Sequence, residues 1–203
     1  LAAKFTGAVE MPTLVEYEAN FEATWSTDTH PLDFPSTPQF SGLVGGTHDA
    51  NVTFWQPGGI ATEGIKSMAE TGAKSTLENE VNEAIDAGNV FSLISGGGVN
   101  PSPGMRTVTF HASITHPLVT LVTMISPSPD WFVGVSGMAL YANGRWRDDV
   151  VVELLGFDAG TDSGTTYTAT NAKITTHIPI VMLEDYAFAK GTPLGTFHFR
   201  RIG

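Results

Sequence analysis

The sequence has no cysteine and few charged residues. All 203 residues are cysteine-free, which excludes disulfide bonds and metal sites built on thiolates, and leaves the redox compartment open. Charged residues make up 15% of the chain, well below the roughly one quarter that is typical of soluble domains, whereas glycine occurs 22 times. This balance favours strands and turns over surface helices.

Basic residues are scarce as well. The chain has 10 Lys and Arg against 21 Asp and Glu, which gives a formal net charge of −11. Neither a basic stripe nor a basic helix is present, so we expect no nucleic-acid partner. The sequence also has no run of about eighteen apolar residues, and we therefore expect no membrane insertion. An acidic surface of this kind suits the binding of cations.

The length of the chain is enough for one substantial core, because β-sandwiches of about this size commonly form a single domain. We therefore expect one domain over residues 1–203. The sequence begins Leu1-Ala2-Ala3 without an initiator methionine. We also expect, from this start, a processed N-terminus from which a signal peptide has been removed.

Alternating apolar residues predict antiparallel strands. From residue 15 to residue 25 every second residue is apolar, which is typical of a half-buried strand. The stretch 105–114 alternates in the same way, and 118–125 is almost continuously apolar, as a central strand would be. We expect further strands at 173–183 and 195–202.

Two stretches with helical spacing interrupt these strands. Residues 60–72 and 76–88 each place apolar side chains on one face, and each ends at a glycine. Closely spaced strands with one helical interruption indicate a sandwich rather than a doubly wound sheet. The sequence thus predicts a mainly β protein, an antiparallel β-sandwich with a short helical insertion at about residues 60–88.

A hairpin is expected around Asn143-Gly144, the commonest two-residue signal for a type I′ turn. Residues 131–141 would form its first strand and 150–155 its second. Asp130 precedes the first strand and follows two prolines, which end the strand before it. Counting back from the turn along both strands places Asp130 opposite Phe157.

This register brings Asp130 beside Asp158, and Asp162 follows in the loop Asp158-Ala159-Gly160-Thr161-Asp162-Ser163-Gly164. Carboxylates this close repel one another, and a divalent cation turns the repulsion into attraction. Carboxylate and carbonyl oxygens suit Ca²⁺ better than Zn²⁺ or Mg²⁺. We therefore predict Asp130, Asp158 and Asp162 as ligands of a calcium ion. The alternative is a solvated loop whose aspartates cap turns.

Other motifs fail on spacing or context. Asp162-Ser163-Gly164 resembles the aspartic-protease motif, but the chain has one copy, and 203 residues is long for a homodimeric protease. Gly134–Gly137 lies in an expected strand rather than at a strand-to-helix turn, which disfavours a serine hydrolase. The six histidines show no metal-binding spacing. His111 alone, on the polar face of its strand, could approach the Asp130 loop.

Asn51-Val52-Thr53 matches the glycosylation sequon Asn-X-Ser/Thr. The pattern is so short that chance explains it unless the protein passes through a eukaryotic secretory pathway. The sequence alone therefore assigns it no role.

Four stretches carry a family resemblance. They are Ser41–Trp55, Gly58–Gly72, Ser128–Val135, which begins Ser-Pro-Asp-Trp, and Asp158–Gly164. In this order they resemble the spondin N-terminal domain family, of F-spondin and mindin type. Several motifs in one order are far more specific than any single signature.

The resemblance implies a C2-like β-sandwich of secreted matrix proteins that binds calcium and acts in adhesion or recognition without catalysis. It also implies that Asp130, Asp158 and Asp162 are the cation ligands, because they occupy the family's ligand positions. Mindin-like relatives have a strand carboxylate near the ion where this chain has His111, so either His111 or a backbone carbonyl is left to complete the site. The chain lacks the cysteines and neighbouring domains of animal spondins, and we expect a stand-alone microbial member.

Two functions follow. The first is a secreted, extracellular, calcium-binding module for cell adhesion, which docks without catalysis to an extracellular protein or glycan through loops near the ion or an exposed edge. The second is a metal-dependent hydrolase that uses the cation as a Lewis acid and His111 or Glu153 as general base. Because no second acid–base pair accompanies these residues, we favour the first.

Overall fold

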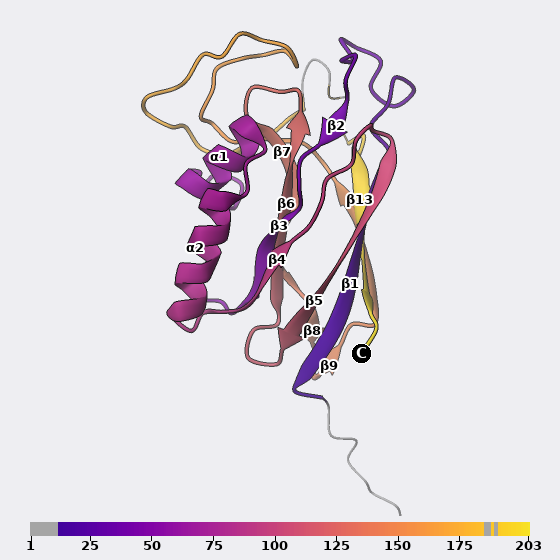
Figure 1. Cartoon of the computed structure of the whole chain (residues 1–203), viewed down its shortest axis with the longest axis vertical. Helices are drawn as coiled ribbons and strands as arrows, with labels where there is room; N and C mark the ends of the chain where they lie inside the picture. Colours follow the sequence, from indigo (N-terminus) through magenta and orange to yellow (C-terminus); the bar gives the residue numbers. More distant parts are fainter. Residues whose placement is uncertain (1–11, 185–187, 189–190) are drawn as a thin grey trace, which may run out of the picture.

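The computed structural model describes residues 12–184, 188 and 191–203, which form two large antiparallel sheets packed face to face and a two-stranded sheet of β8 and β9 (Figure 1). The smaller sheet has the strand order β10-β13-β1-β5, and the larger has β12-β11-β7-β6-β3-β4, with β2 paired to β6. Both helices lie on the outer face of the larger sheet. The elements are β1 (Leu14–Ala23), β2 (Gln39–Phe40), β3 (Val44–His48), α1 (Glu63–Thr71), α2 (Ser75–Asp86), β4 (Val90–Ser95), β5 (Gly104–Ser113), β6 (Leu118–Ser126), β7 (Trp131–Ala139), β8 (Tyr141–Ala142), β9 (Arg145–Trp146), β10 (Asp149–Leu154), β11 (Phe157–Asp158), β12 (Val181–Met182) and β13 (Gly195–Arg201). The expected mainly β sandwich with a helical insertion is confirmed.

Two layers of buried side chains hold these elements together. Tyr17 and Phe21, which point inward from β1, pack in one cluster with Leu121 and Val133 of the larger sheet. A second cluster joins the helices to the outer face of the larger sheet, and Phe132 belongs to it. Since β7 contributes Phe132 to one layer and Val133 to the other, this strand is buried on both faces.

A side-chain cap begins helix α1 and a glycine ends it. Thr62 caps α1, because its Oγ1 accepts a hydrogen bond from the amide of Ile65 at 3.1 Å. Glu80 of α2 accepts from the amide of Gly64 at 2.7 Å and from Thr62 Oγ1 at 2.7 Å. Gly72 ends α1 in the left-handed region, with φ of 73°. In the described part of the chain, no helix is long and apolar enough to cross a membrane.

The expected hairpin is correct at its turn and wrong in its second strand. Ala142 pairs with Arg145 across the turn, as the Asn143-Gly144 signal predicts. Beyond it, however, β10 crosses to the smaller sheet and pairs with β13. Val150 and Leu154 are buried there and Val152 is partly buried, while Val151 and Glu153 are exposed, an alternation that suits a sheet with one face open to solvent. The two helices pack against the outer face of the larger sheet.

The expected strand at 173–183 is also wrong over most of its length. Only Val181–Met182 pair as a strand, with β11, and Lys173 makes an isolated bridge with Asp162. Pro179 lies between these points and has no amide hydrogen to donate to a ladder. The segment instead forms a long loop beside the start of β7.

Candidate metal centre

The short strand β11 places the aspartates. It pairs with the beginning of β7, so that Asp158 faces Trp131, and the amide of Ala159 donates to the carbonyl of Asp130 at 3.1 Å. The predicted proximity of Asp130 and Asp158 is therefore present, although Asp130 does not face Phe157 as the hairpin register required. The strand that delivers Asp158 is β11, not the continuation of β10 along β7.

Asp130 is fully buried at the centre of this arrangement. Its Oδ2 accepts hydrogen bonds from the amide of Thr161 at 2.7 Å, from Thr161 Oγ1 at 3.1 Å and from the amide of Asp162 at 3.0 Å. Its Oδ1 is buried and has no hydrogen-bond partner among the described residues. Burial, and then the charge of Asp158, raises the pKa of Asp130 to about 6.

Asp158 lies half-buried beside it. Its Oδ1 accepts from the amide of Gly160 at 2.7 Å, and its Oδ2 accepts from Trp131 Nε1 at 3.3 Å. Burial raises the pKa of Asp158, and the charge of Asp162 acts in the same direction. Two neighbouring carboxylates are thus held in surroundings that disfavour their charged forms.

Asp162 has a different set of contacts. Its Oδ1 accepts from the amide of Gly164 and its Oδ2 from the amide of Ala172, both at 2.8 Å. These bonds are those of an aspartate that organises its own loop, which was the alternative interpretation of the motif. Across the part of the chain described, no group of three or more His, Asp or Glu side chains converges closely enough to hold a metal ion. Asp130 Oδ1 is the carboxylate oxygen that fits a cation best, while Asp158 and Asp162 each have both oxygens hydrogen-bonded and would have to share their lone pairs with those donors.

A cavity of about 240 Å³ opens beside Asp158, and sequence reasoning missed it. Its walls combine aromatic and apolar side chains with carboxylates. They are Trp131, Asp158, Gly164, Thr165, Val181, Met182, Leu183, Glu184 and Phe188. Most of these residues come from the loops after β11 and around β12, whose positions no local pattern predicts. The one available signal was the apolar run from Ile180 to Leu183 after Pro179.

The expectation that His111 approaches the aspartates is wrong. His111 is exposed on β5 and pairs with Glu16. Its carbonyl accepts a hydrogen bond from Thr47 Oγ1 at 2.8 Å, and Thr47 pairs with Val119 near the start of β6. The aspartates lie near the other end of β6. Alternation predicted the face on which His111 points, but not the end of the sandwich at which it lies.

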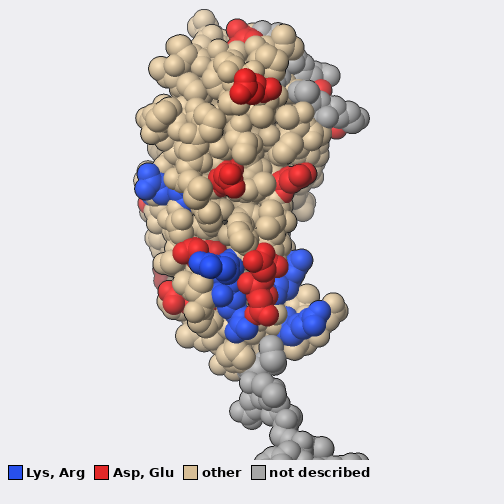
Figure 2. Space-filling view, turned by 90° about the vertical axis from the view of Figure 1, so that its right-hand side faces the viewer, with Lys and Arg blue, Asp and Glu red and all other residues tan. Residues whose placement is uncertain are grey.

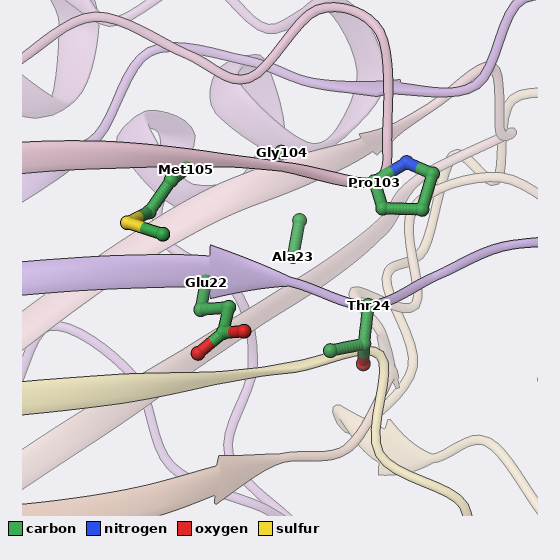
Figure 3. A pocket seen from close by; sticks show the side chains of 6 residues that line it. All are labelled: Glu22, Ala23, Thr24, Pro103, Gly104 and Met105. Carbon is green, nitrogen blue, oxygen red and sulfur yellow. The ribbon is translucent and has the colours of Figure 1, made fainter.

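A second, wider groove at the edge of the smaller sheet lacks convergent polar groups. It has a volume of about 470 Å³ and lies between the ends of β1 and β5. Figure 3 shows its six lining residues, among which Glu22 is the one titratable side chain. Without a second acid or base, this groove does not resemble a catalytic site.

The outer face of the smaller sheet carries paired charges. Arg200 lies 3.0 Å from Glu18, and Arg201 lies 2.5 Å from Asp148. Figure 2 shows Lys and Arg mixed with Asp and Glu in the lower half of this view, and separate acidic side chains above them with a basic group at the left edge. This face therefore has no continuous basic stripe of the kind that binds nucleic acid.

Comparisons of the sequence with known proteins show which proteins the chain resembles. Residues 15–190 match the Spondin_N family model. Spondin-2 of Rattus norvegicus is 31% identical over 193 residues, which cover 93% of this chain and 58% of that protein. Spondin-1 of Homo sapiens is 34% identical over 182 residues, which cover 82% of this chain and 22% of that protein. The matched part thus spans less than two thirds of either relative.

Proposed function

Because the chain belongs to the Spondin_N family, we propose that it is an extracellular recognition module that binds Ca²⁺ through Asp130, Asp158 and Asp162. The observation that carries this proposal is the buried Oδ1 of Asp130, which has no hydrogen-bond partner among the described residues and lies next to a second carboxylate. A buried, unpaired carboxylate oxygen is costly, and a cation removes that cost.

The ion would supply positive charge, and the protein residues would supply its position. Asp130 offers Oδ1 while its Oδ2 stays bound to the amides of Thr161 and Asp162. Asp158 would offer carboxylate oxygens from β11. Asp162 would offer carboxylate oxygens from the loop that follows β11. Ca²⁺ takes six to eight oxygen ligands in flexible geometry, so carbonyls and water would complete the shell in place of His111. Binding would then tie the start of β7 to the loop after β11.

The proposed contact surface for a partner is the cavity beside Asp158. Trp131 and Phe188 form apolar walls there, and Val181 and Met182 are exposed at its margin. A pocket of apolar walls with a few polar groups is typical of recognition sites. Asp158 both lines this cavity and is a proposed ligand of the ion. An extracellular protein or glycan that docks here would therefore touch Asp158. Calcium would therefore affect adhesion directly.

The hydrolase alternative has little to support it. His111, one proposed general base, lies near the opposite end of the sandwich from Asp130. Glu153, the other, is exposed on β10 and pairs with Thr196 in the smaller sheet. A general base must lie within hydrogen-bond reach of the proton that it removes. We therefore propose a non-catalytic role.

Thermal unfolding with Ca²⁺, Mg²⁺ and a chelator tests the proposal. If Ca²⁺ binds the folded state alone, a concentration of one hundred times the dissociation constant adds about 2.7 kcal/mol to the free energy of unfolding. We expect a higher melting temperature in Ca²⁺ than in chelator, with a smaller effect of Mg²⁺. Identical melting curves in Ca²⁺ and chelator would remove the calcium site from the proposal.

A further inference from the structure

The sequon Asn51-Val52-Thr53 lies where a glycan can be attached. Asn51 is in the turn that follows β3, and both Asn51 and Thr53 are exposed. The next two residues, Phe54 and Trp55, are buried in the cluster under the helices. The turn is therefore held in place from below while its acceptor asparagine faces solvent.

The contacts of Asn51 leave its side chain replaceable. The carboxylate of Asp49 accepts from the amide of Asn51 and from Asn51 Nδ2, both at 2.8 Å. The backbone bond is the one that shapes the turn, and it does not depend on the Asn51 side chain. A glycosylated asparagine keeps one N–H on Nδ2, which is enough for the bond to Asp49. A sugar at this position would thus cost neither packing nor the turn.

The position is also remote from the candidate metal centre. His48, which ends β3, pairs with Leu118 at the start of β6, whereas Met124 near the end of β6 pairs with Phe132 beside Asp130. A glycan on Asn51 would therefore be attached near the start of β6, whereas the aspartates lie near its end.

We propose that Asn51 is a site of N-linked glycosylation, an inference that rests on the proposed extracellular location and on passage through a eukaryotic secretory pathway, but not on calcium. In the transfer, Nδ2 of Asn51 forms a bond to the anomeric carbon of an oligosaccharide carried on a lipid pyrophosphate. The bond from that carbon to the pyrophosphate breaks, the lipid pyrophosphate leaves, and Nδ2 loses one proton. Thr53 supplies the hydroxyl that the sequon requires two residues after the asparagine.

The chain offers a matched control. Asn100-Pro101-Ser102 also has an asparagine followed two residues later by a hydroxyl residue, but proline in the middle position prevents acceptance. Ser102 is also buried and donates to the carbonyl of Trp25 at 2.8 Å. Asn100→Gln should therefore leave the glycan unchanged, whereas Asn51→Gln should remove it.

The test is secretion of the full chain, behind a supplied signal peptide, from cultured animal cells. We expect an intact mass that exceeds the polypeptide mass by one N-glycan, and a peptide-N-glycosidase that removes this excess and converts Asn51 to aspartate. Asn51→Gln and Thr53→Ala should each abolish the excess, and two independent variants guard against a folding defect in one. A secreted wild-type protein of unmodified mass, or a glycan elsewhere, overturns the inference. Calcium-dependent melting, measured on the same samples, should be equal with and without the glycan, so the two proposals fail separately.

Discussion

Asp130 is the single residue on which the proposed metal site depends most. Asp130→Asn keeps an oxygen that can accept from the amides of Thr161 and Asp162, and it removes a buried charge. We expect the variant to melt in chelator at or above the wild-type temperature and to lose the calcium-dependent shift, which is about 2.7 kcal/mol at one hundred times the dissociation constant. Thermal unfolding in both buffers measures this. A lower melting temperature in chelator together with an intact calcium response would mean that Asp130 only caps the loop.

The two loop aspartates provide a second prediction at this scale. Asp158→Asn and Asp162→Asn should each abolish most of the calcium-dependent shift, because each removes a ligand charge. Asp148→Asn and Asp149→Asn are matched controls, since these exposed residues pair with Arg201 and His198 on the smaller sheet. Exposed pairs contribute at most about 1 kcal/mol, and neither control should change the calcium response. An intact response in both Asp158→Asn and Asp162→Asn would reject the ligand assignment.

The raised pKa of Asp130 makes stability depend on pH. The pKa is about 6 in the folded protein against a usual value of 3.8, so between these values the folded state binds more protons than the unfolded chain. Without calcium, this group therefore lowers the free energy of unfolding as pH rises through that window, by roughly 3 kcal/mol at most. The raised pKa of Asp158 acts in the same direction.

Calcium competes with these protons, so its stabilising effect should grow with pH. We expect a small calcium-dependent shift at about pH 5 and the full shift at about pH 7.5. Urea unfolding at both values, with calcium and with chelator, measures it. Asp130→Asn is the control that removes the titrating group. Equal shifts at both pH values would contradict a role for Asp130 as ligand.

The sequence predicted the candidate aspartates but not how each is held. Asp130 and Asp158 flank elements with strong local signals, two prolines before β7 and a glycine-containing loop after β11. Thr161 and Asp162 both donate to Oδ2 of Asp130, which leaves Oδ1 without a partner. This arrangement depends on tertiary packing. The cavity that Met182 lines depends on a long loop returning to β11, which leaves no periodic signal.

At the scale of elements, strands with a clear alternation were predictable, whereas the segment 173–183 and the partner of β10 were not. Alternation identified β1 almost to the residue, and Asn143-Gly144 identified the turn between β8 and β9. Residues 150–155 were expected to pair with the strand now labelled β7, because strands that follow one another in the chain usually pair. The true partner of β10, β13, lies far along the sequence, and the choice depends on which sheet leaves one face in solvent. Such competition between distant partners is decided by the whole core, not by local pattern.

The helical insertion offers a test at the same scale. Glu80 of α2 binds the amide of Gly64 and the hydroxyl of Thr62, and so joins the two helices through the N-terminus of α1. Because charge-assisted hydrogen bonds are lost and their donors are left unpaired, Glu80→Ala should lower the free energy of unfolding by about 1.5–3 kcal/mol. Urea unfolding measures it, with Glu83→Ala, an exposed position on the same helix, as control. Equal losses in the two variants would remove the capping role.

At the scale of the whole molecule, β6 joins the two proposed sites. Its first residue, Leu118, pairs with His48 before the turn that carries Asn51, and Met124 near its end pairs with Phe132, two residues after Asp130. The interior between them is packed in two continuous layers. A rigid sandwich of this kind can hold a modified end and a binding end apart, so that each acts without disturbing the other.

Hydrogen exchange can show whether calcium acts on one end alone. The amides of Thr161 and Asp162 donate to Asp130, and those of Gly164 and Ala172 donate to Asp162. Calcium should slow exchange at these amides, because opening of the loop would then require loss of the ion. The turn at residues 49–53 should exchange at the same rate in calcium and in chelator. Asp130→Asn should show no slowing anywhere, and slowing spread evenly over the chain in the wild type would indicate a general effect of the salt instead of a site at the aspartates.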